Sequence, residues 1–186
     1  RQPSTPEDFT IIHGDKTYKI HKILACSQSI YFRHLLQGDF EESRTGILTL
    51  KNDTDDSDAV AAMIQFLYEW KYTLPKEYRD SEATFAAKVA VVADRFQFSA
   101  LFENASEEIA KAFDVVREVE VEQWLDVARI VYKHLDTDIQ EHIDFRRIVL
   151  DTLWQHRSKV RVRTMLQNAE VRAFLRTHGV AALDIL

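Results

Sequence analysis

The stretch DKTYKIHKILACSQSIYF, residues 15–32, contains the change of pattern that decides the fold. Residues 17–20 alternate between polar and apolar side chains, which is typical of a β-strand. After His21 the apolar residues recur at roughly helical spacing, and serines interrupt them. The stretch therefore predicts a strand followed directly by two short helices, with Ser27 or Ser29 beginning the second helix and Gly38 ending it.

The segments on either side predict the rest of a mixed fold. Residues 9–12 form a mostly apolar run, and a turn containing Gly14 joins them to residues 17–20, which predicts a hairpin. Residues 47–50 are a third strand candidate, and residues 60–68 carry the apolar spacing of an amphipathic helix. From residue 83 onward the pattern is helical throughout. The predicted fold class is α+β: a small sheet flanked by helices, followed by an all-helical part.

The composition favours an ordinary globular protein that is largely helical. Apolar residues make up 46% of the 186 residues and charged residues 29%, with only four glycines and three prolines. Cys26 is the single cysteine, which excludes an internal disulfide and favours a reducing, intracellular setting in the nucleus or cytoplasm. No apolar run approaches the roughly 20 residues that cross a bilayer, so we expect no membrane partner.

The net charge of −6 is unevenly distributed. Residues 145–186 hold eight Lys and Arg against three Asp and Glu, whereas residues 1–144 hold 16 against 27. Phosphate neutralisation supplies most of the affinity for nucleic acid, so the acidic body is a poor nucleic-acid binder. Only the basic C-terminal part is a candidate for that function.

Short motifs run through the first half of the chain. They are Asp8, Gly14, His21-Lys22-x-Leu24-Ala25, Ser29-x-Tyr31-Phe32, and residues 40–43, 66–68 and 90–96, followed by Leu101. In this order they resemble the BTB/POZ domain family, which implies a small sheet flanked by paired helices. Residues 128–132, 146–153 and 174–186 resemble the helical extension of many fungal BTB proteins. We therefore predict a flexible lead-in at 1–8, a BTB/POZ domain at 9–115, and a helical extension at 116–186 packed on it.

His21, Cys26 and Ser29 are the residues that first suggest an enzyme. A thiolate nucleophile needs a base nearby that a third group holds in line, and the spacing identifies none. A lone cysteine usually acts as a small buried hydrophobic residue. In the family resembled here the histidine is architectural, at a junction where a polar residue caps or pins the turn. We therefore expect no catalytic residues.

Two groups of residues have a spacing that suggests metal binding. His134, Asp138 and His142 would share one face of an unbroken helix, and Asp136 lies between them. Ligands two turns apart diverge, however, and a polar loop between helices explains the cluster better. The acidic run within residues 53–58 lacks the glycine and glutamate of a calcium loop and is better explained by helix capping. We expect no metal and no cofactor.

The basic stretch Arg157, Lys159, Arg161 and Arg163 is a candidate basic patch. Its alternation would place four cations on one side of an extended segment. The lack of interleaved aromatic residues favours a solvated face over nucleic-acid binding. A contact with an acidic protein partner ranks between these two interpretations. A nucleic-acid-associated regulatory protein is therefore the alternative function.

The resemblance implies a protein–protein interaction module that acts as an adaptor or scaffold. Some members of the family are substrate adaptors for cullin ubiquitin ligases and carry an apolar-x-Glu element in the helix after the Tyr/Phe pair. Residues 35–37 occupy that place, with glutamine instead of glutamate, and Asp39 is a nearby carboxylate. The candidate protein-binding surface consists of Leu35, Leu36, Gln37, Asp39, Phe40 and Tyr72.

Self-association is the second kind of contact that the resemblance implies. Many BTB domains exchange an N-terminal strand and helix across a two-fold interface. The chain starts only eight residues before the first predicted strand, so the exchange element is missing from it. We expect a monomer, or a dimer that uses another surface.

Overall fold

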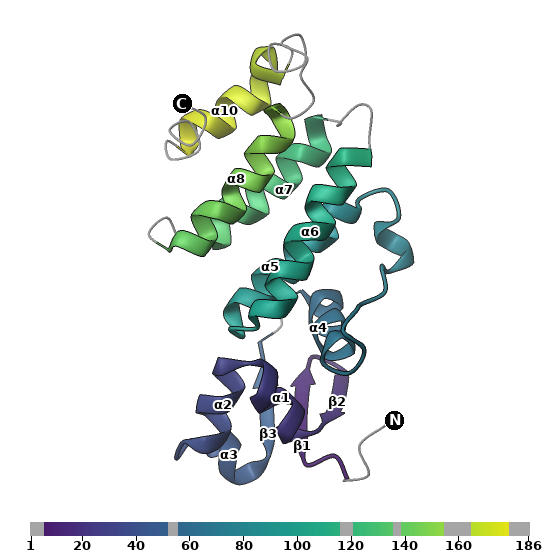
Figure 1. The fold of residues 1–186 in the computed structure, drawn as a ribbon, viewed down its shortest axis with the longest axis vertical. Helices are drawn as coiled ribbons and strands as arrows, with labels where there is room; N and C mark the ends of the chain where they lie inside the picture. The colour runs from purple at the N-terminus through teal and green to yellow at the C-terminus, as the bar shows by residue number, and fades with distance from the viewer. Residues whose placement is uncertain (1–5, 52–55, 116–120, 136–138, 155–164, 179–186) are drawn as a thin grey trace. The chain divides into compact units, whose positions relative to one another are not determined.

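The computed structural model describes residues 6–51, 56–115, 121–135, 139–154 and 165–178 (Figure 1). It divides into two compact units. The first comprises Arg1–Pro75 and Lys88–Asn104, and the second comprises Lys76–Ala87 and Ala105–Leu186. Helices α5 (Glu82–Arg95) and α6 (Ser99–Val115) each contribute residues to both units.

The first unit contains a three-stranded sheet with the order β2-β1-β3. Strands β1 (Phe9–His13) and β2 (Lys16–Ile20) form the predicted antiparallel hairpin. Its turn includes Gly14, whose φ of 60° is a left-handed value that suits a residue without a Cβ. Strand β3 (Ile47–Leu50) pairs with β1 in parallel (Figure 1). A parallel pair needs a long connection, and the helices between β2 and β3 provide it.

Helices α1 (Lys22–Gln28) and α2 (Ile30–Gln37) are the two predicted short helices. Ser29 separates them, and its hydroxyl accepts a hydrogen bond from the Phe32 N–H, as expected of an N-cap. Gly38 ends α2 as predicted, but its φ of −86° is not left-handed. A Cβ at this position would lie 2.7 Å from Phe40 Cε2, so the glycine makes room for the Phe40 ring. A five-residue helix that the sequence did not predict, α3 (Glu41–Thr45), follows.

Helix α4 (Ser57–Glu69) is the predicted amphipathic helix. Asp56 caps it by accepting hydrogen bonds from the N–H groups of Asp58 (3.0 Å) and Ala59 (3.1 Å). The Lys88 ammonium lies 2.9 Å from the other carboxylate oxygen of Asp56. Trp70 ends the helix in a left-handed conformation with φ 56°, which non-glycine residues rarely adopt.

Aromatic rings fill the centre of the first unit. The rings of Phe32 and Phe96 stack at 5.4 Å and 8°, and Phe9 meets Phe32 edge-on at 6.2 Å. All three side chains are at most 2% exposed. Fully burying one phenylalanine stabilises a fold by about 1.5–3 kcal/mol, so this cluster is a principal contribution to the first unit.

The second unit is helical, as the sequence predicts. It contains a short 3-10 helix (Lys76–Tyr78) and helices α7 (Val121–His134), α8 (Gln140–Trp154) and α10 (Ala169–Thr177), together with the parts of α5 and α6 named above. The fully buried Trp124 of α7 donates its indole N–H to the carbonyl of Val149 in α8 at 3.1 Å. Its ring also meets Phe174 of α10 edge-on at 6.0 Å. Trp124 thus joins three helices of this unit.

Among the helices in the described ranges, none has both the length and the apolar character that a bilayer crossing needs.

Candidate protein-binding surfaces

The side chains of His21, Cys26 and Ser29 make separate contacts within the fold. His21 Nδ1 lies 2.8 Å from the Tyr68 hydroxyl, and Cys26 Sγ lies 3.7 Å from the Phe32 carbonyl oxygen. Burial raises the pKa of Cys26, which opposes formation of a thiolate. The buried Ser29 hydroxyl acts as the N-cap of α2. These contacts support the architectural interpretation of the three residues.

His21 lies at the junction of β2 and α1 but does not cap the helix with its side chain. It occupies the N-cap position of α1, but its side chain makes no capping hydrogen bond. The Asp8 carboxylate accepts from the Lys22 N–H at 2.7 Å instead. The His21 ring instead contacts the Tyr68 hydroxyl of α4, and this contact pins the turn before α1.

The predicted histidine–carboxylate cluster is divided between two helices. His134 is the last residue of α7, and the buried His142 lies in α8, while Asp136 and Asp138 lie outside the described residues. His134 and His142 therefore do not share one helix, and the loop interpretation stays a prediction. Within the described ranges, no three His, Cys, Asp or Glu side chains converge in a way that could hold a metal ion.

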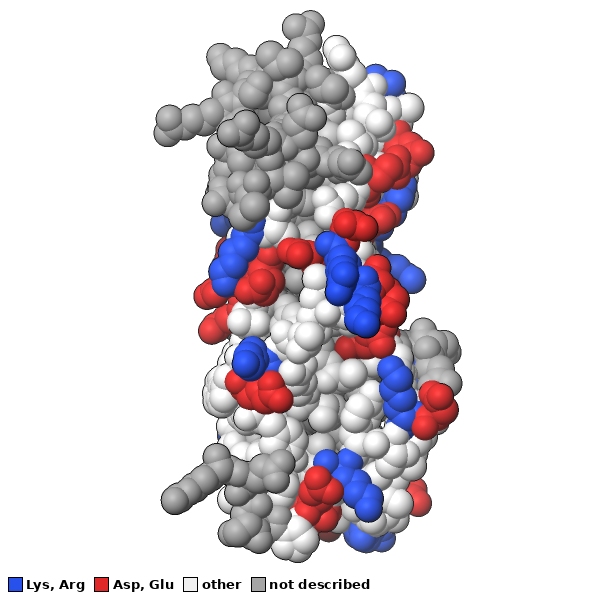
Figure 2. All heavy atoms as spheres, turned by 90° about the vertical axis from the view of Figure 1, so that its right-hand side faces the viewer, with Lys and Arg blue, Asp and Glu red and all other residues white. Residues whose placement is uncertain are grey.

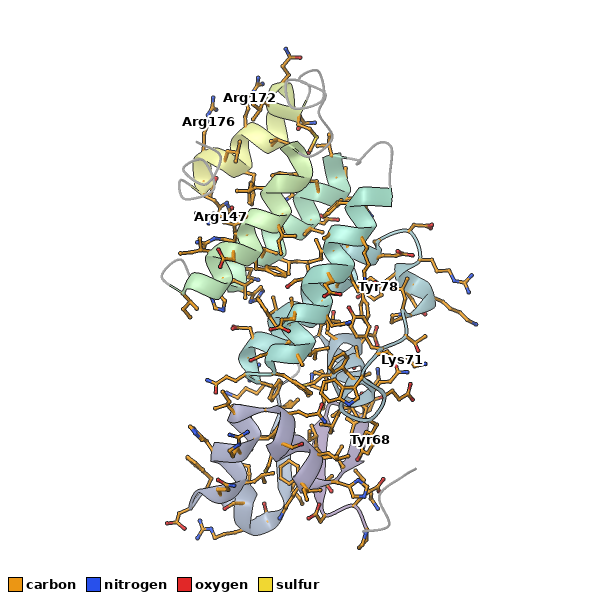
Figure 3. The ribbon with its side chains drawn as sticks, in the orientation of Figure 1. Tyr68, Lys71, Tyr78, Arg147, Arg172 and Arg176 are labelled. Atoms are coloured by element: carbon orange, nitrogen blue, oxygen red, sulfur yellow. The ribbon has the colours of Figure 1, made fainter. Side chains whose placement is uncertain are left out.

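The other predicted charged runs are only partly described. In the acidic run, Asp56 caps α4 as expected, and Asp53 and Asp55 lie outside the described residues. The candidate basic patch, Arg157, Lys159, Arg161 and Arg163, also lies outside them. Figure 3 labels three arginines of the described second unit: Arg147 on α8, and Arg172 and Arg176 on α10. All three are exposed.

Most of the predicted protein-binding surface lies at the end of α2 and the turn into α3. Gln37 and Asp39 are exposed, Leu36 is half-buried, and Phe40 is 53% exposed. We call these four residues the α2–α3 surface. Leu35 faces the interior with only 8% of its surface exposed, so it cannot present an apolar face to a partner. Tyr72, the sixth predicted residue, is half-buried and lies after α4.

The turn that carries Phe40 is held by local contacts. The Ser43 hydroxyl lies 2.7 Å from the carbonyl oxygen of Gly38 and 2.8 Å from that of Phe40. Gly38 leaves room for the ring, as described above. The exposed aromatic side chain is therefore positioned before any partner arrives, which lowers the entropy that binding would cost.

A second surface, which the sequence analysis missed, is a groove between α1 and α4 with a volume of about 790 Å³. We call it the α1–α4 groove. It is formed within the first unit by α1, α4, β2 and the segment before β1. The residues that line it are Glu7, Lys19, Leu24, Gln28, Ala61, Ile64, Gln65, Leu67, Tyr68, Glu69 and Trp70.

Two aromatic residues at the end of α4 contribute to this groove. The Tyr68 hydroxyl accepts a hydrogen bond from the His21 backbone N–H at 3.1 Å, in addition to its contact with the His21 ring. Figure 3 labels Tyr68 within the first unit. Trp70 is 60% exposed and contacts Phe66 with its ring centroid at 5.7 Å. An exposed indole in a left-handed conformation is a costly arrangement, and such strain is concentrated at functional sites.

The groove carries a mixture of charges in which carboxylates predominate. Among the described residues, the Glu7 and Glu69 carboxylates and the Lys19 ammonium line it. Burial raises the pKa of Tyr68, and the nearby negative charges of Glu7 and Asp8 raise it further. Figure 2 shows that acidic and basic side chains are interspersed over the described part of one face, with much uncharged surface in its lower half.

Comparison with known proteins identifies the family. The BTB/POZ domain model matches residues 1–113. Kelch repeat and BTB domain-containing protein 4 from Homo sapiens and from Mus musculus are each 24% identical over 132 residues, which cover 71% of this chain and 22% of each relative. The chain thus spans less than a quarter of the length of these relatives.

Among solved structures, the BTB domain of zebrafish PATZ1 matches with a TM-score of 0.43 and 17% identity, covering 56% of this chain and 75% of that chain. The predicted α+β BTB fold, followed by further helices, is confirmed by the family match and the described elements. The resemblance of the second half to fungal proteins stays a prediction, as do the domain boundaries. This chain belongs to the BTB/POZ domain family, whose domains are protein–protein interaction modules.

Proposed function

We propose that this chain is a non-enzymatic adaptor whose α2–α3 surface binds a scaffold protein of the cullin ubiquitin-ligase class. The observation that carries the proposal is Phe40, a large aromatic side chain that is 53% exposed on a turn fixed by local hydrogen bonds. Rigidly presented aromatic residues are typical anchors of protein interfaces. The separate structural contacts of His21, Cys26 and Ser29 support the non-enzymatic part of the proposal.

The composition of the α2–α3 surface suits a partner with an apolar pocket and a polar rim. Phe40 and the exposed part of Leu36 supply the apolar anchor, while Gln37 and Asp39 supply polar groups beside it. Gln37 offers a neutral hydrogen bond where the related adaptors offer a carboxylate. A charge-assisted hydrogen bond is roughly twice as strong as a neutral one, so we expect this chain to bind its scaffold more weakly than those adaptors do.

Binding to purified cullin scaffolds, measured by isothermal titration calorimetry, tests the proposal. Phe40→Ala and Leu36→Glu should each weaken binding about tenfold or more, which corresponds to about 1.4 kcal/mol. Gln37→Glu should strengthen it several-fold, because it introduces a charged acceptor. Gly38→Ala should weaken it by displacing the Phe40 ring.

Ile139→Ala is the matched control, since Ile139 is an apolar residue of the second unit that is 45% exposed. Binding by this control should equal that of the unmodified chain. Failure of the unmodified chain to bind any cullin would eliminate the scaffold class proposed here. Equal binding by the Phe40→Ala and unmodified chains would eliminate the α2–α3 surface.

A further inference from the structure

We propose that the α1–α4 groove binds a short helical segment of a second protein, one that presents an apolar face with a Lys or Arg beside it. This inference rests on the proposed adaptor function, because it names the partner that the adaptor would bring to its scaffold. The groove and the α2–α3 surface share no residue. One chain can therefore be tested for the two contacts separately.

The outer face of α4 has the spacing that suits a partner helix. Ala61, Ile64, Gln65 and Tyr68 line the groove at positions i, i+3, i+4 and i+7, so they form one stripe over two turns, about 10 Å long. Such a stripe packs against the ridges of another helix. The opposite face of α4 is already buried in the first unit through residues such as Met63. Apolar residues on both faces of a helix indicate that the outer face also has a partner.

The dimensions of the groove fit a few side chains of such a segment. Its volume of about 790 Å³ leaves room for several side chains of a partner. Leu24 of α1 and Leu67 of α4 supply apolar contacts along it. Helix-in-groove recognition uses this arrangement, with apolar anchors at helical spacing.

Trp70 provides an independent reason to assign binding to this groove. Glycine would adopt its φ of 56° without strain, whereas tryptophan adopts it at a steric cost and stays 60% exposed. The contact of its ring with Phe66 accounts for only part of the indole, most of which is exposed. Tryptophan is among the residues most enriched at the energetic centres of interfaces.

The charges of the groove decide which class of helix it takes. The Glu69 carboxylate accepts a hydrogen bond from the Gln65 amide at 3.0 Å, and Gln65 accepts one from the Thr73 N–H at 2.8 Å. The carboxylate is thus held in place beside Trp70. Together with Glu7 it outnumbers Lys19, so the groove is complementary to a cationic side chain.

Gln28 adds an acceptor to this side of the site. Its amide nitrogen donates to the Leu67 carbonyl at 3.0 Å, which fixes the orientation of the amide. Its Oε1 is buried, and none of the described residues donates a hydrogen bond to it. A Lys, Arg or other donor of the bound segment could satisfy this oxygen after a small shift of the Gln28 side chain, which again favours a donor-rich ligand.

Selection of random 16-residue peptides against the full chain, followed by fluorescence anisotropy, tests the inference. The peptides recovered should be amphipathic, with apolar residues at helical spacing and at least one Lys or Arg. Trp70→Gly should weaken their binding at least thirtyfold while keeping or raising the midpoint of thermal unfolding, because glycine removes the left-handed strain. Glu69→Lys should weaken it about tenfold, and a peptide with its basic residue changed to Glu should recover part of that loss.

Gln97→Gly is the matched control, since Gln97 also has a positive φ, 48°, but does not line the groove. It should leave peptide binding unchanged. Phe40→Ala should also leave peptide binding unchanged, and Trp70→Gly should leave scaffold binding unchanged. The two proposed contacts can therefore be refuted independently of each other. Recovery of no peptide, or of peptides that bind the Trp70→Gly variant equally well, would overturn the inference. The inference would also be overturned if light scattering showed a dimer that Trp70→Gly converts to a monomer, because a second copy of the chain would then fill the groove.

Discussion

The Ser29 hydroxyl donates a hydrogen bond to the carbonyl oxygen of Phe96, 67 residues further along the chain, at 2.6 Å. The Ser29 hydroxyl oxygen also accepts a hydrogen bond from the Phe32 N–H at 3.0 Å, and the Ser29 side chain is completely buried. One hydroxyl therefore caps α2 and joins it to the residue that follows α5. A buried polar group that is satisfied both as donor and as acceptor stabilises a unique arrangement of the elements around it.

Replacing Ser29 by alanine should lower the free energy of unfolding by roughly 2–3 kcal/mol, since it removes a helix cap and leaves a buried carbonyl without this donor. Urea denaturation followed by circular dichroism measures the loss. Ser27→Ala is the control, because the exposed Ser27 hydroxyl bonds to the Leu24 carbonyl in its own helix. Losses of the same size in the two variants would refute the structural role of Ser29.

Asp56 should make the stability of the first unit sensitive to acid. Burial alone would raise its pKa, but the Lys88 ammonium and the amide N–H groups of α4 outweigh burial and lower the pKa below the usual 3.8. Its stabilising contribution is therefore present above the unfolded-state pKa and is lost as the pH falls through the lower folded-state pKa. Thermal unfolding between about pH 6 and pH 2 should show a smaller acid-induced loss for Asp56→Asn than for the unmodified chain.

At neutral pH, Asp56→Ala should cost roughly 1–2 kcal/mol, and Asp56→Asn should cost less, because asparagine still caps a helix. Chemical denaturation of the two variants separates the cap from the ion pair with Lys88. A larger loss for asparagine than for alanine would contradict the capping role.

Cys26 should react slowly with thiol reagents in the folded protein. Burial raises the pKa of its thiol, so little thiolate is present at neutral pH. Mass spectrometry after iodoacetamide treatment should show slower labelling than that of a free cysteine, and the rate should increase with pH. The urea-unfolded chain should react at the ordinary rate. Labelling of the folded chain faster than a free cysteine would reopen the hypothesis of a catalytic thiol.

Trp124→Phe should destabilise the second unit by roughly 1–3 kcal/mol, because it removes the hydrogen bond to Val149 and leaves a cavity among buried side chains. Thermal unfolding monitored by circular dichroism gives the change. The control is Trp70→Phe, which alters an exposed indole of the first unit and should have a small effect. A greater loss of stability from Trp70→Phe than from Trp124→Phe would contradict the prediction that the buried Trp124 contributes more to stability.

The features that the sequence predicted correctly depend on near neighbours. The hairpin follows from alternation around Gly14, and the start of α2 follows from Ser29, whose partner Phe32 lies three residues away. Helix α3 was missed because five residues are too few to show apolar periodicity. Leu35 was placed on the surface because residues 35–37 occupy the place of the apolar-x-Glu element of the resembled adaptors, whereas the packing of α2 buries this side chain.

The α1–α4 groove could not be found by pattern reading, because four separate segments form it. Glu7, Lys19, Leu24 and Ile64 come together only when β2, α1 and α4 have folded. Trp70 was the available signal, since an aromatic residue directly after a helix occupies a position that commonly suits glycine. Its exposure, however, depends on the tertiary structure. The conformation of Gly38 likewise depends on the Phe40 ring and not on the turn preferences of glycine.

The parallel pairing of β1 with β3 has a consequence for synthesis of the protein on the ribosome. Residues 10–13 find their hairpin partners in β2 almost at once, but their partners on the other side, residues 47–50, emerge more than thirty residues later. Until then the nascent chain carries an open strand edge rich in isoleucine, which is the kind of edge that associates with other chains. A polypeptide released before residue 47 would keep that edge permanently, so we expect prematurely terminated products to aggregate or to require chaperones.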